Sequence, residues 1–285
     1  MSWLFLVLAI AGYVAMNLVM KLGSLRGLNS SELTGSLFAL ASLYCLLILI
    51  FSGQSLNFTA TVVLLAVAGG AGGAVAYFFF LQALKIGSYA LTISIYTMTF
   101  LNPVIFSIIF WDRQVTTLIT LGILLIIAGI ILISLAGSTP ESQKSGLFLK
   151  WLIFLIATFF LTGIPQISQA AAVRLAEINL WSYLFITFLA GALVFLIYLF
   201  VKKVRLPRQA LSFGALAAAG SVAGNFFTMR ALAGLPEPVV FPVIQAGPII
   251  AAVILSLAYF KEKIKPAAYF GIILGLAGIV LLTLK

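Results

Sequence analysis

Long apolar runs follow one another along the whole chain, and short gaps marked by polar residues, Gly or Pro separate them. A bilayer core of ~30 Å needs about 20 residues of α-helix to cross it, and most of the runs have about this length. The pattern therefore predicts ten transmembrane helices, at residues 2–20, 32–51, 61–84, 88–110, 115–136, 150–173, 179–201, 210–232, 239–260 and 267–284. The gaps are too short to hold an extramembrane domain.

The two halves of the chain share a pattern of five predicted helices each. Moving the second half back by 149 residues places the Gly-rich run 271–278 on 122–129, and the charged turn 261–262 on 112–113. Because five is odd, the second copy enters the membrane from the opposite side, which gives repeats of inverted topology. Many transporters share this plan and hold their substrate near the bilayer midplane between the repeats.

This comparison predicts an all-α polytopic membrane protein with three parts. They are a first five-helix repeat at 1–136, a polar connector at 137–149 and a second, inverted five-helix repeat at 150–285.

Composition and charge support the membrane class. Hydrophobic residues make up 64% of the chain and charged residues only 8%, whereas soluble domains have about 25% charged residues. The net charge of +10 comes from basic residues in the gaps, with 12 of the 16 Lys and Arg on one side of the membrane. The positive-inside rule then predicts both termini on the outer face. A basic domain that could bind nucleic acid is not predicted.

The groups that an enzyme needs are missing from the predicted spans. The chain has no His and a single Cys45, none of its six carboxylates lies mid-span, and it has no phosphate-cradling motif of an ATPase. Acid–base, nucleophilic and metal catalysis all need such groups. We therefore expect no catalytic residue, no metal site, no cofactor and no ATP-driven pumping, and an intramembrane enzyme is the least supported hypothesis.

Uncharged polar side chains instead recur along single helix faces. In the sixth predicted span, Thr162, Gln166 and Gln169 continue a stripe with the spacing of one α-helical face. Such groups need a hydrogen-bond partner inside a bilayer. Several of them also match across the repeat: Asn17 with Gln166, Tyr13 with Thr162, Tyr77 with Asn225, and Tyr96 with Gln245.

We interpret these positions as the lining of a hydrated, substrate-binding cavity; the alternative is that they only join helices by hydrogen bonds. The predicted set is Asn17, Tyr77, Tyr96, Gln166, Asn225, Gln245, Tyr13, Thr162, Gln169 and Arg230. Arg230 would meet a substrate carboxylate or extend to the membrane surface. Glu237 is the acid closest to a predicted lining helix, and a role in proton coupling is a hypothesis for this residue.

Other apolar and small residues have structural interpretations. The four Trp residues lie near span ends and are predicted to anchor the helices at the membrane interface. The run 78–80, which is Phe-Phe-Phe, is predicted to contact lipid. Pairs of glycines four residues apart, such as Gly220 and Gly224, predict close helix packing.

The ends of the two halves carry a family resemblance. In the second half, Pro248 in the ninth span is followed by a charged turn at 261–263 and a Gly-rich closing helix. The first half has the same order, with Pro103 about one turn out of step and Asp112 where the family usually has Glu. With ten spans in two inverted halves, the chain resembles the drug/metabolite transporter superfamily, in its EamA-type branch.

The resemblance implies a carrier for small metabolites, often amino acids or amphipathic compounds, in a bacterial or archaeal inner membrane, with a cavity between its halves. The expected function is secondary transport of a small neutral, zwitterionic or amphipathic solute by alternating access, as a uniporter, an exchanger or a proton-coupled carrier. The alternative is a non-transporting membrane scaffold or receptor subunit. Expected partners are the solute and the lipid bilayer but no nucleic acid, for a monomer or, alternatively, an oligomer.

Overall fold

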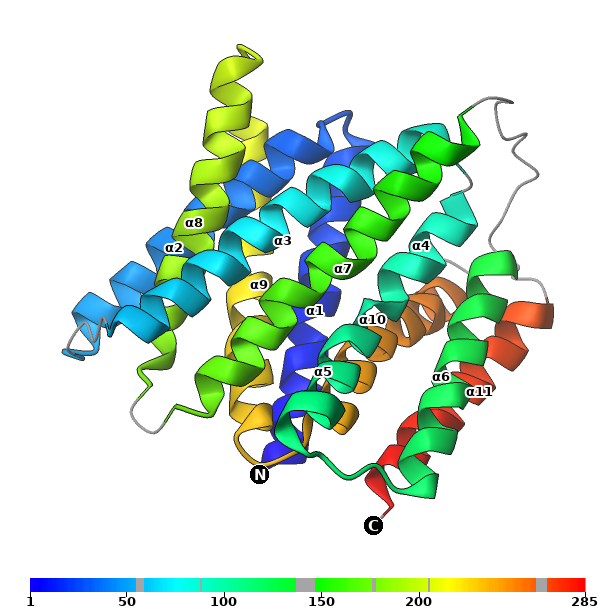
Figure 1. Cartoon of the computed structure of the whole chain (residues 1–285). Helices are drawn as coiled ribbons and strands as arrows, with labels where there is room; N and C mark the ends of the chain where they lie inside the picture. Colours follow the sequence, from blue (N-terminus) through cyan, green and yellow to red (C-terminus); the bar gives the residue numbers. More distant parts are fainter. Residues whose placement is uncertain are drawn as a thin grey trace. The chain divides into compact units, whose positions relative to one another are not determined.

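The computed structural model describes residues 1–54, 59–87, 89–136, 147–175, 178–204, 206–259 and 266–284. All regular structure in these residues is helical (Figure 1). The helices are α1 (Ser2–Leu25), α2 (Ser30–Phe51), α3 (Ala60–Ile86), α4 (Tyr89–Thr97), the 3₁₀-helix η1 (Met98–Phe100), α5 (Leu101–Trp111), α6 (Thr117–Ala136), α7 (Phe148–Val173), α8 (Leu180–Val201), α9 (Arg208–Leu232), α10 (Glu237–Tyr259) and α11 (Pro266–Thr283).

The predicted spans correspond to these helices. Within the described residues, eight helical segments are long and apolar enough to cross a membrane, with α4, η1 and α5 counting together as one. Two more spans are represented by the shorter apolar stretches Thr117–Ile133 and Glu237–Ala251. Most of the polar connector predicted at 137–149, and the charged turn predicted at 261–263, lie outside the described residues.

The chain forms two compact units, and each unit draws on both halves of the sequence. Unit 1 comprises Met1–Val75 and Ile167–Gly234, and unit 2 comprises Ala76–Gln166 and Leu235–Lys285. Helices therefore pack against helices from the other half of the sequence: α1 against α9 and α2 against α8 in unit 1, and α6 against α11 in unit 2.

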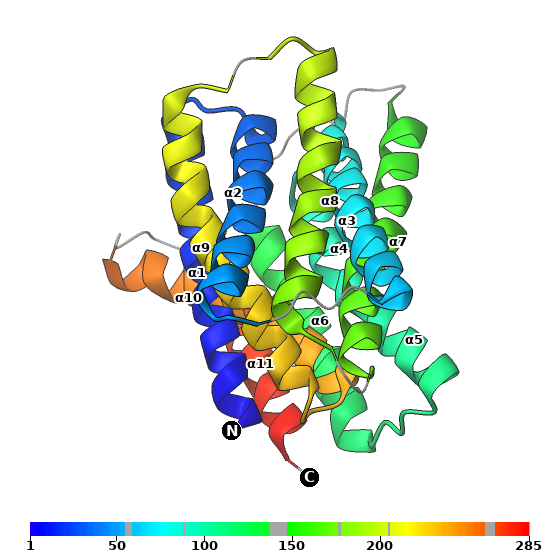
Figure 2. The same ribbon diagram turned by 90° about the vertical axis from the view of Figure 1, so that its left-hand side faces the viewer.

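In unit 1, α1 and α9 approach each other through glycines, and α2 lies beside α9 (Figure 2). A Cβ atom added to Gly12 would lie 2.7 Å from the backbone nitrogen of Gly224 and 2.8 Å from the carbonyl oxygen of Gly220. A side chain on any of these glycines would push the helices apart, so the predicted packing role of the pair Gly220 and Gly224 is confirmed.

In unit 2, α6 and α11 run side by side and antiparallel (Figure 1). A Cβ atom on Gly122 would lie 2.9 Å from the carbonyl oxygen of Gly278, and one on Gly271 would lie 2.8 Å from that of Gly129. Since Gly122 corresponds to Gly271 and Gly129 to Gly278 in the repeat, exchanging the repeats turns one contact into the other. This reciprocity is the signature of a two-fold relation between equivalent surfaces.

The fourth predicted span is interrupted at its centre. It begins as α4, narrows into the 3₁₀-helix η1 and continues as α5, in which Pro103 is the third residue. Proline has no N–H group and its ring crowds the carbonyl four residues earlier, which is that of Thr99. A continuous α-helix through this point is therefore disfavoured.

Two predictions about aromatic residues are wrong in part. Trp151 is only 5% exposed, and its indole Nε1 donates to Thr92 Oγ1 at 3.0 Å instead of anchoring at an interface. Phe80, predicted to face lipid, is 7% exposed and stacks on Tyr96 with 4.2 Å between ring centroids. In both cases a partner from another helix covers the side chain, Thr92 for Trp151, predicted at the interface, and Tyr96 for Phe80, predicted against lipid.

Candidate functional site

Unit 1 brings two of the predicted residues into direct contact. Gln169 on α7 donates from Nε2 to Asn225 Oδ1 on α9 at 2.7 Å. Asn225 Nδ2 in turn donates at 2.8 Å to the carbonyl oxygen of Ser221, one turn earlier in α9. Gln169 is buried, at 7% exposed, and Asn225 is half-buried. Together they form an uncharged amide pair between two helices.

A second contact in unit 1 lies one turn further along α9. The Tyr13 hydroxyl on α1 lies 3.4 Å from Thr228 Oγ1, and Thr228 also donates to the carbonyl oxygen of Gly224 at 2.8 Å. The Tyr13 ring lies against Gly224, where a Cβ atom would be 2.8 Å from it. Asn225 and Thr228 therefore continue one polar face of α9.

The remaining predicted residues of unit 1 are exposed. Asn17 lies on an exposed part of α1. Arg230 is exposed near the end of α9, and its guanidinium carbon lies 5.4 Å from the centre of the Phe5 ring. This is a cation–π contact, and it holds the charged group of Arg230 beside the first turns of α1.

In unit 2, the polar contacts gather at the interrupted fourth span. Gln245 on α10 donates from Nε2 to Thr99 Oγ1 at 3.4 Å, and Thr99 Oγ1 donates to the carbonyl oxygen of Tyr96 at 2.8 Å. Thr99 is fully buried. Gln245 from the second repeat therefore contacts the centre of the interrupted span from the first.

Asn102 is a central residue here that the sequence analysis missed. Its Nδ2 donates to the carbonyl oxygen of Thr99 at 3.0 Å and to that of Phe159 on α7 at 2.8 Å. The first bond replaces the N–H that Pro103 lacks, and the second joins the interrupted span to α7. Gly163 allows this approach, since a Cβ there would lie 2.6 Å from Asn102 Cβ. The signal in the sequence was an Asn directly before Pro in an apolar run.

Two further predicted residues, Thr162 and Gln166, are four residues apart and share one face of α7. Among the described residues, Thr162 Oγ1 and Gln166 Oε1 are buried and have no hydrogen-bond partner. They flank Pro165, which removes another backbone donor from α7. Buried polar atoms without a partner are rare in native proteins, because leaving such an atom without a hydrogen bond costs free energy.

Tyr77 and Tyr96 both contact the ring of Phe80. The Phe80 ring is 5.7 Å from that of Tyr77 and 4.2 Å from that of Tyr96, between centroids. Both tyrosines are half-buried. The two phenols therefore share an aromatic cluster formed by the second half of α3 and by α4.

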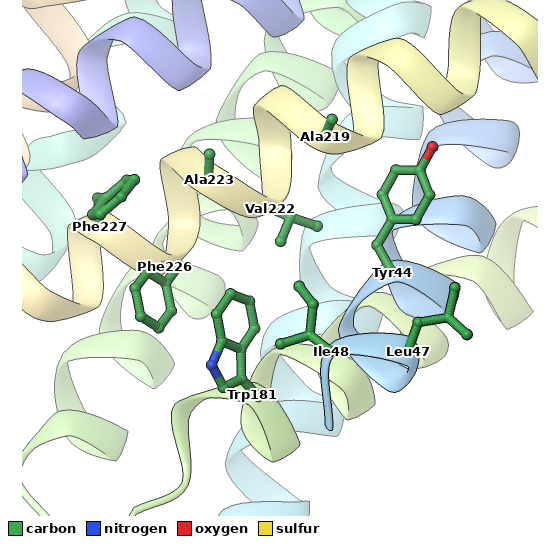
Figure 3. A pocket seen from close by; sticks show the side chains of 9 residues that line it. All are labelled: Tyr44, Leu47, Ile48, Trp181, Ala219, Val222, Ala223, Phe226 and Phe227. Carbon is green, nitrogen blue, oxygen red and sulfur yellow. The ribbon is translucent and has the colours of Figure 1, made fainter. Parts of the chain in front are cut away.

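Unit 1 also contains an apolar groove of about 510 Å³ between α2 and α9 (Figure 3). Its lining residues are Tyr44, Leu47, Ile48, Trp181, Ala219, Val222, Ala223, Phe226 and Phe227. Trp181 and Phe226 stack at one end, with ring centroids 4.3 Å apart and planes 11° from parallel.

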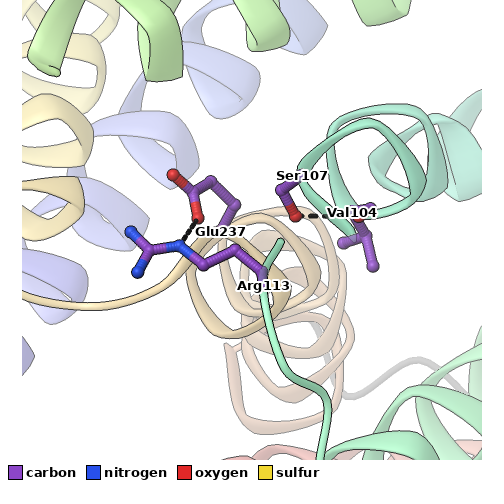
Figure 4. Close-up of polar contacts among 4 residues, drawn as sticks. All are labelled: Val104, Ser107, Arg113 and Glu237. Carbon is purple, nitrogen blue, oxygen red and sulfur yellow. Dashed lines mark hydrogen bonds and ion pairs between the residues drawn. The ribbon is translucent and has the colours of Figure 1, made fainter. Parts of the chain in front are cut away.

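An ion pair joins the first repeat to the second within unit 2 (Figure 4). Asp112 ends α5 with φ +50°, and the chain reverses so that Arg113 Nε meets Glu237 Oε2 at 2.9 Å. The Glu237 side chain is 4% exposed and that of Arg113 41% exposed. Glu237 is the first residue of α10, where the helix dipole also stabilises a carboxylate.

No metal-binding cluster accompanies these polar groups. Three or more His, Cys, Asp or Glu side chains do not gather anywhere within the described part of the chain. The polar contacts given above are made by hydroxyls, amides and aromatic rings, and the charged groups among them, Arg113, Arg230 and Glu237, lie at or near helix ends.

The helices and these uncharged mid-span groups define a polytopic helical membrane protein. A sequence model of the EamA-like transporter family matches residues 1–135 and 143–284, and the chain belongs to this family. It is therefore a membrane transporter of small molecules, and the predicted all-α fold of ten transmembrane helices in two inverted five-helix repeats is confirmed.

Comparison with solved structures supports the same fold. Matches extend to 28 chains. One of them, described as a crystal structure of a protein, gives a TM-score of 0.79 over 98% of this chain and 95% of that chain, at 18% identity. No curated protein matches the sequence.

Proposed function

We propose that this protein carries a small neutral, zwitterionic or amphipathic metabolite, such as an amino acid, across the membrane by alternating access. The observation that supports this most is the unpartnered pair of buried atoms on α7, Thr162 Oγ1 and Gln166 Oε1. A solute or water hydrogen-bonded to them would remove the cost of burying them. The amide pair Gln169 and Asn225, and the contact of Gln245 with Thr99, supply further uncharged groups.

The chemistry of these groups sets the proposed substrate class. Amides and hydroxyls donate and accept hydrogen bonds without a net charge, and Tyr77 and Tyr96 offer aromatic surface. A bare cation would find poor solvation among them. Uniport or exchange is therefore at least as well supported as proton coupling.

Flux into proteoliposomes tests this proposal. We expect Gln166→Ala and Asn225→Ala each to reduce uptake of a transported neutral amino acid by roughly threefold to tenfold, the effect of losing one hydrogen bond. Ser212→Ala is the matched control, because Ser212 lies exposed on α9 and bonds only to Arg208 of its own helix among the described residues. A thermal-shift screen against a metabolite panel identifies the solute first, since a ligand of the folded state raises the unfolding temperature.

Cysteine substitutions distinguish the rival functions. A scaffold or receptor subunit would have a closed bundle, so Cys at Asn17 or Gln166 would resist water-soluble thiol reagents. We expect Gln166→Cys to react with these reagents, and the transported solute to lower the rate of this reaction. Absence of both labelling and flux would contradict the proposal, and turnover of a solute into a new compound would favour an intramembrane enzyme.

We also propose that the protein lies in a bacterial or archaeal cytoplasmic membrane with both termini on the outer face. The distribution of Lys and Arg supports the orientation. The proposed partners are the solute and lipid, with no nucleic acid and no cofactor, for a chain that acts as a monomer or within an oligomer.

A further inference from the structure

The apolar groove of unit 1 is open to its surroundings. Leu47 is 39% exposed, and Ala219 is exposed on the facing side of α9. Ala219 and Ala223 line the groove with small side chains, which leave space beside α9 that a bulkier residue would occupy (Figure 3). The lining residues lie toward one end of the helices, since Trp181 is the second residue of α8 and Phe226 is six residues before the end of α9. In a membrane-spanning chain, exposed apolar surface between such helices contacts lipid chains.

A line of contacts connects this groove to a charged group. Phe227 lines the groove and stacks on Phe5 with 6.0 Å between ring centroids. The Arg230 guanidinium lies over that Phe5 ring, at 5.4 Å. Arg230 also follows Phe226 by four residues and Phe227 by three, so all three share one face of α9.

The charged end of this line lies at a membrane face. Phe5 is in the first turns of α1, and Arg230 is in the last turn of α9. Arginine at the end of a span can extend its guanidinium to the headgroup level, and Arg230 is exposed there. The groove residues Trp181, Phe226 and Phe227 lie near the same ends of α8 and α9. An apolar groove that leads to a fixed cation has the shape and charge of one amphiphile with an anionic head and an acyl chain.

We propose that this surface binds an anionic phospholipid, with the headgroup phosphate on Arg230 and an acyl chain in the groove between Tyr44, Trp181 and Phe226. Arginine is suited to this role because its planar guanidinium binds phosphate in a bidentate manner. The stacked Trp181 and Phe226 present a rigid apolar wall at low entropic cost. This inference goes beyond solute transport and does not depend on the proposed solute site.

Brominated lipids test the proposal, because bromine quenches the fluorescence of a nearby indole. The full chain is reconstituted in phosphatidylcholine vesicles with increasing fractions of phosphatidylglycerol that carries dibrominated acyl chains. The difference between the wild type and Trp181→Phe isolates the Trp181 signal. We expect half-maximal quenching at a roughly fivefold lower fraction than with brominated phosphatidylcholine, as one basic residue near a membrane surface provides.

Two arginines of the same helix provide the matched comparison. Arg230→Gln is expected to abolish the fivefold preference, whereas Arg208→Gln, an exposed residue at the opposite end of α9, is expected to preserve it. Arg230→Lys keeps the charge and should keep most of the preference. Unfolding temperatures and elution profiles establish whether each variant is folded. If a variant does not fold, the comparison of the two brominated lipids in the wild type still tests the proposal.

Several outcomes would overturn the proposal. Equal quenching by the two lipids would mean ordinary bulk-lipid contact. Equal effects of Arg230→Gln and Arg208→Gln would mean general surface charge. Absence of any Trp181 quenching would mean that another occupant, such as a second copy of the chain, fills the groove. If soluble glycerol 3-phosphate removed the preference for phosphatidylglycerol, Arg230 would bind a free phosphate compound and not a lipid headgroup.

Discussion

At the residue scale, side-chain amides of this protein donate hydrogen bonds to backbone carbonyl oxygens of their own span. Asn102 donates from Nδ2 to the Thr99 carbonyl, to which Pro103 cannot donate because it has no N–H group. Asn225 donates to the Ser221 carbonyl of its own helix and accepts from Gln169. Such groups both stabilise irregular helix geometry in a bilayer and present polar atoms at mid-span.

A double-mutant cycle tests whether the Asn102 side chain replaces the N–H group that Pro103 lacks. We expect Asn102→Ala to lower the free energy of unfolding by about 1–3 kcal/mol, because the buried Thr99 carbonyl loses a donor. Pro103→Ala restores a backbone N–H to the same position. Thermal unfolding in detergent should then show that Asn102→Ala costs about 1 kcal/mol less in the Pro103→Ala background. Strictly additive effects would contradict this role of Asn102.

The Arg113–Glu237 pair is predicted to be structural. Because Arg113 is 41% exposed, solvent screens the pair, and we expect Glu237→Gln to lower the free energy of unfolding by about 1–2 kcal/mol, less than the ~3–5 kcal/mol for a fully buried pair. Chemical denaturation measures this change. Flux per folded molecule should keep whatever dependence on a pH gradient the wild type has. Loss of that dependence in Glu237→Gln would instead assign proton coupling to Glu237.

At the element scale, helices in this protein associate through glycine. Without a hydrophobic driving force between helices in lipid, close backbone approach provides the packing contacts. The faces of α6 and α11 meet at Gly122, Gly129, Gly271 and Gly278, where a Cβ atom would lie within 3 Å of a facing carbonyl oxygen. The close packing of α6 on α11 therefore requires that these four positions have no side chain.

Gly129→Ala is predicted to destabilise the pair of α6 and α11. Helix propensity alone favours Ala over Gly by about 1 kcal/mol, but a Cβ at Gly129 would lie 2.6 Å from the Gly271 carbonyl oxygen. We expect a net loss of about 1–3 kcal/mol from overpacking, measured by thermal unfolding. Leu124→Ala on the exposed face of α6 is the comparison and should change stability little. A higher unfolding temperature for Gly129→Ala would refute this packing.

At the scale of the whole molecule, the repeat decides which helices meet. Each compact unit takes helices from both halves of the sequence, and equivalent helices such as α6 and α11 pack on each other. Each repeat therefore supplies helices that pack against helices of the other repeat. The domain boundaries at 1–136, 137–149 and 150–285 stay a prediction about sequence repeats and do not describe compact units.

The orientation of the chain can be tested with cysteine labelling. In a Cys45→Ala background, we expect Cys at Ser2 and at Leu284 to react with a membrane-impermeant maleimide in intact cells, because ten spans place both termini on one face and the Lys and Arg distribution makes it the outer one. Cys at Val204, between α8 and α9, should react only after the membrane is opened. The reverse pattern would invert the topology.

The sequence identified part of the candidate site. The polar stripe on α7 was visible because hydroxyls and amides are expensive in an apolar span, and the structure pairs two of the predicted residues, Gln169 and Asn225. Asn102 was missed because its significance depends on Phe159 and Gly163, 57 and more residues away. The burial of Trp151 depends in the same way on Thr92.

By itself, the sequence determined the ten spans, the repeat and the membrane class. Hydropathy records the preference of each residue for lipid or water, and this preference is local, so it survives without coordinates. Only the tertiary structure decided which helix faces meet, that each compact unit mixes the two halves, and which polar atoms remain without a protein partner. Those features depend on the distances between side chains that are far apart in sequence. The apolar pattern carries no information about these distances, because lipid and a neighbouring helix are equally apolar.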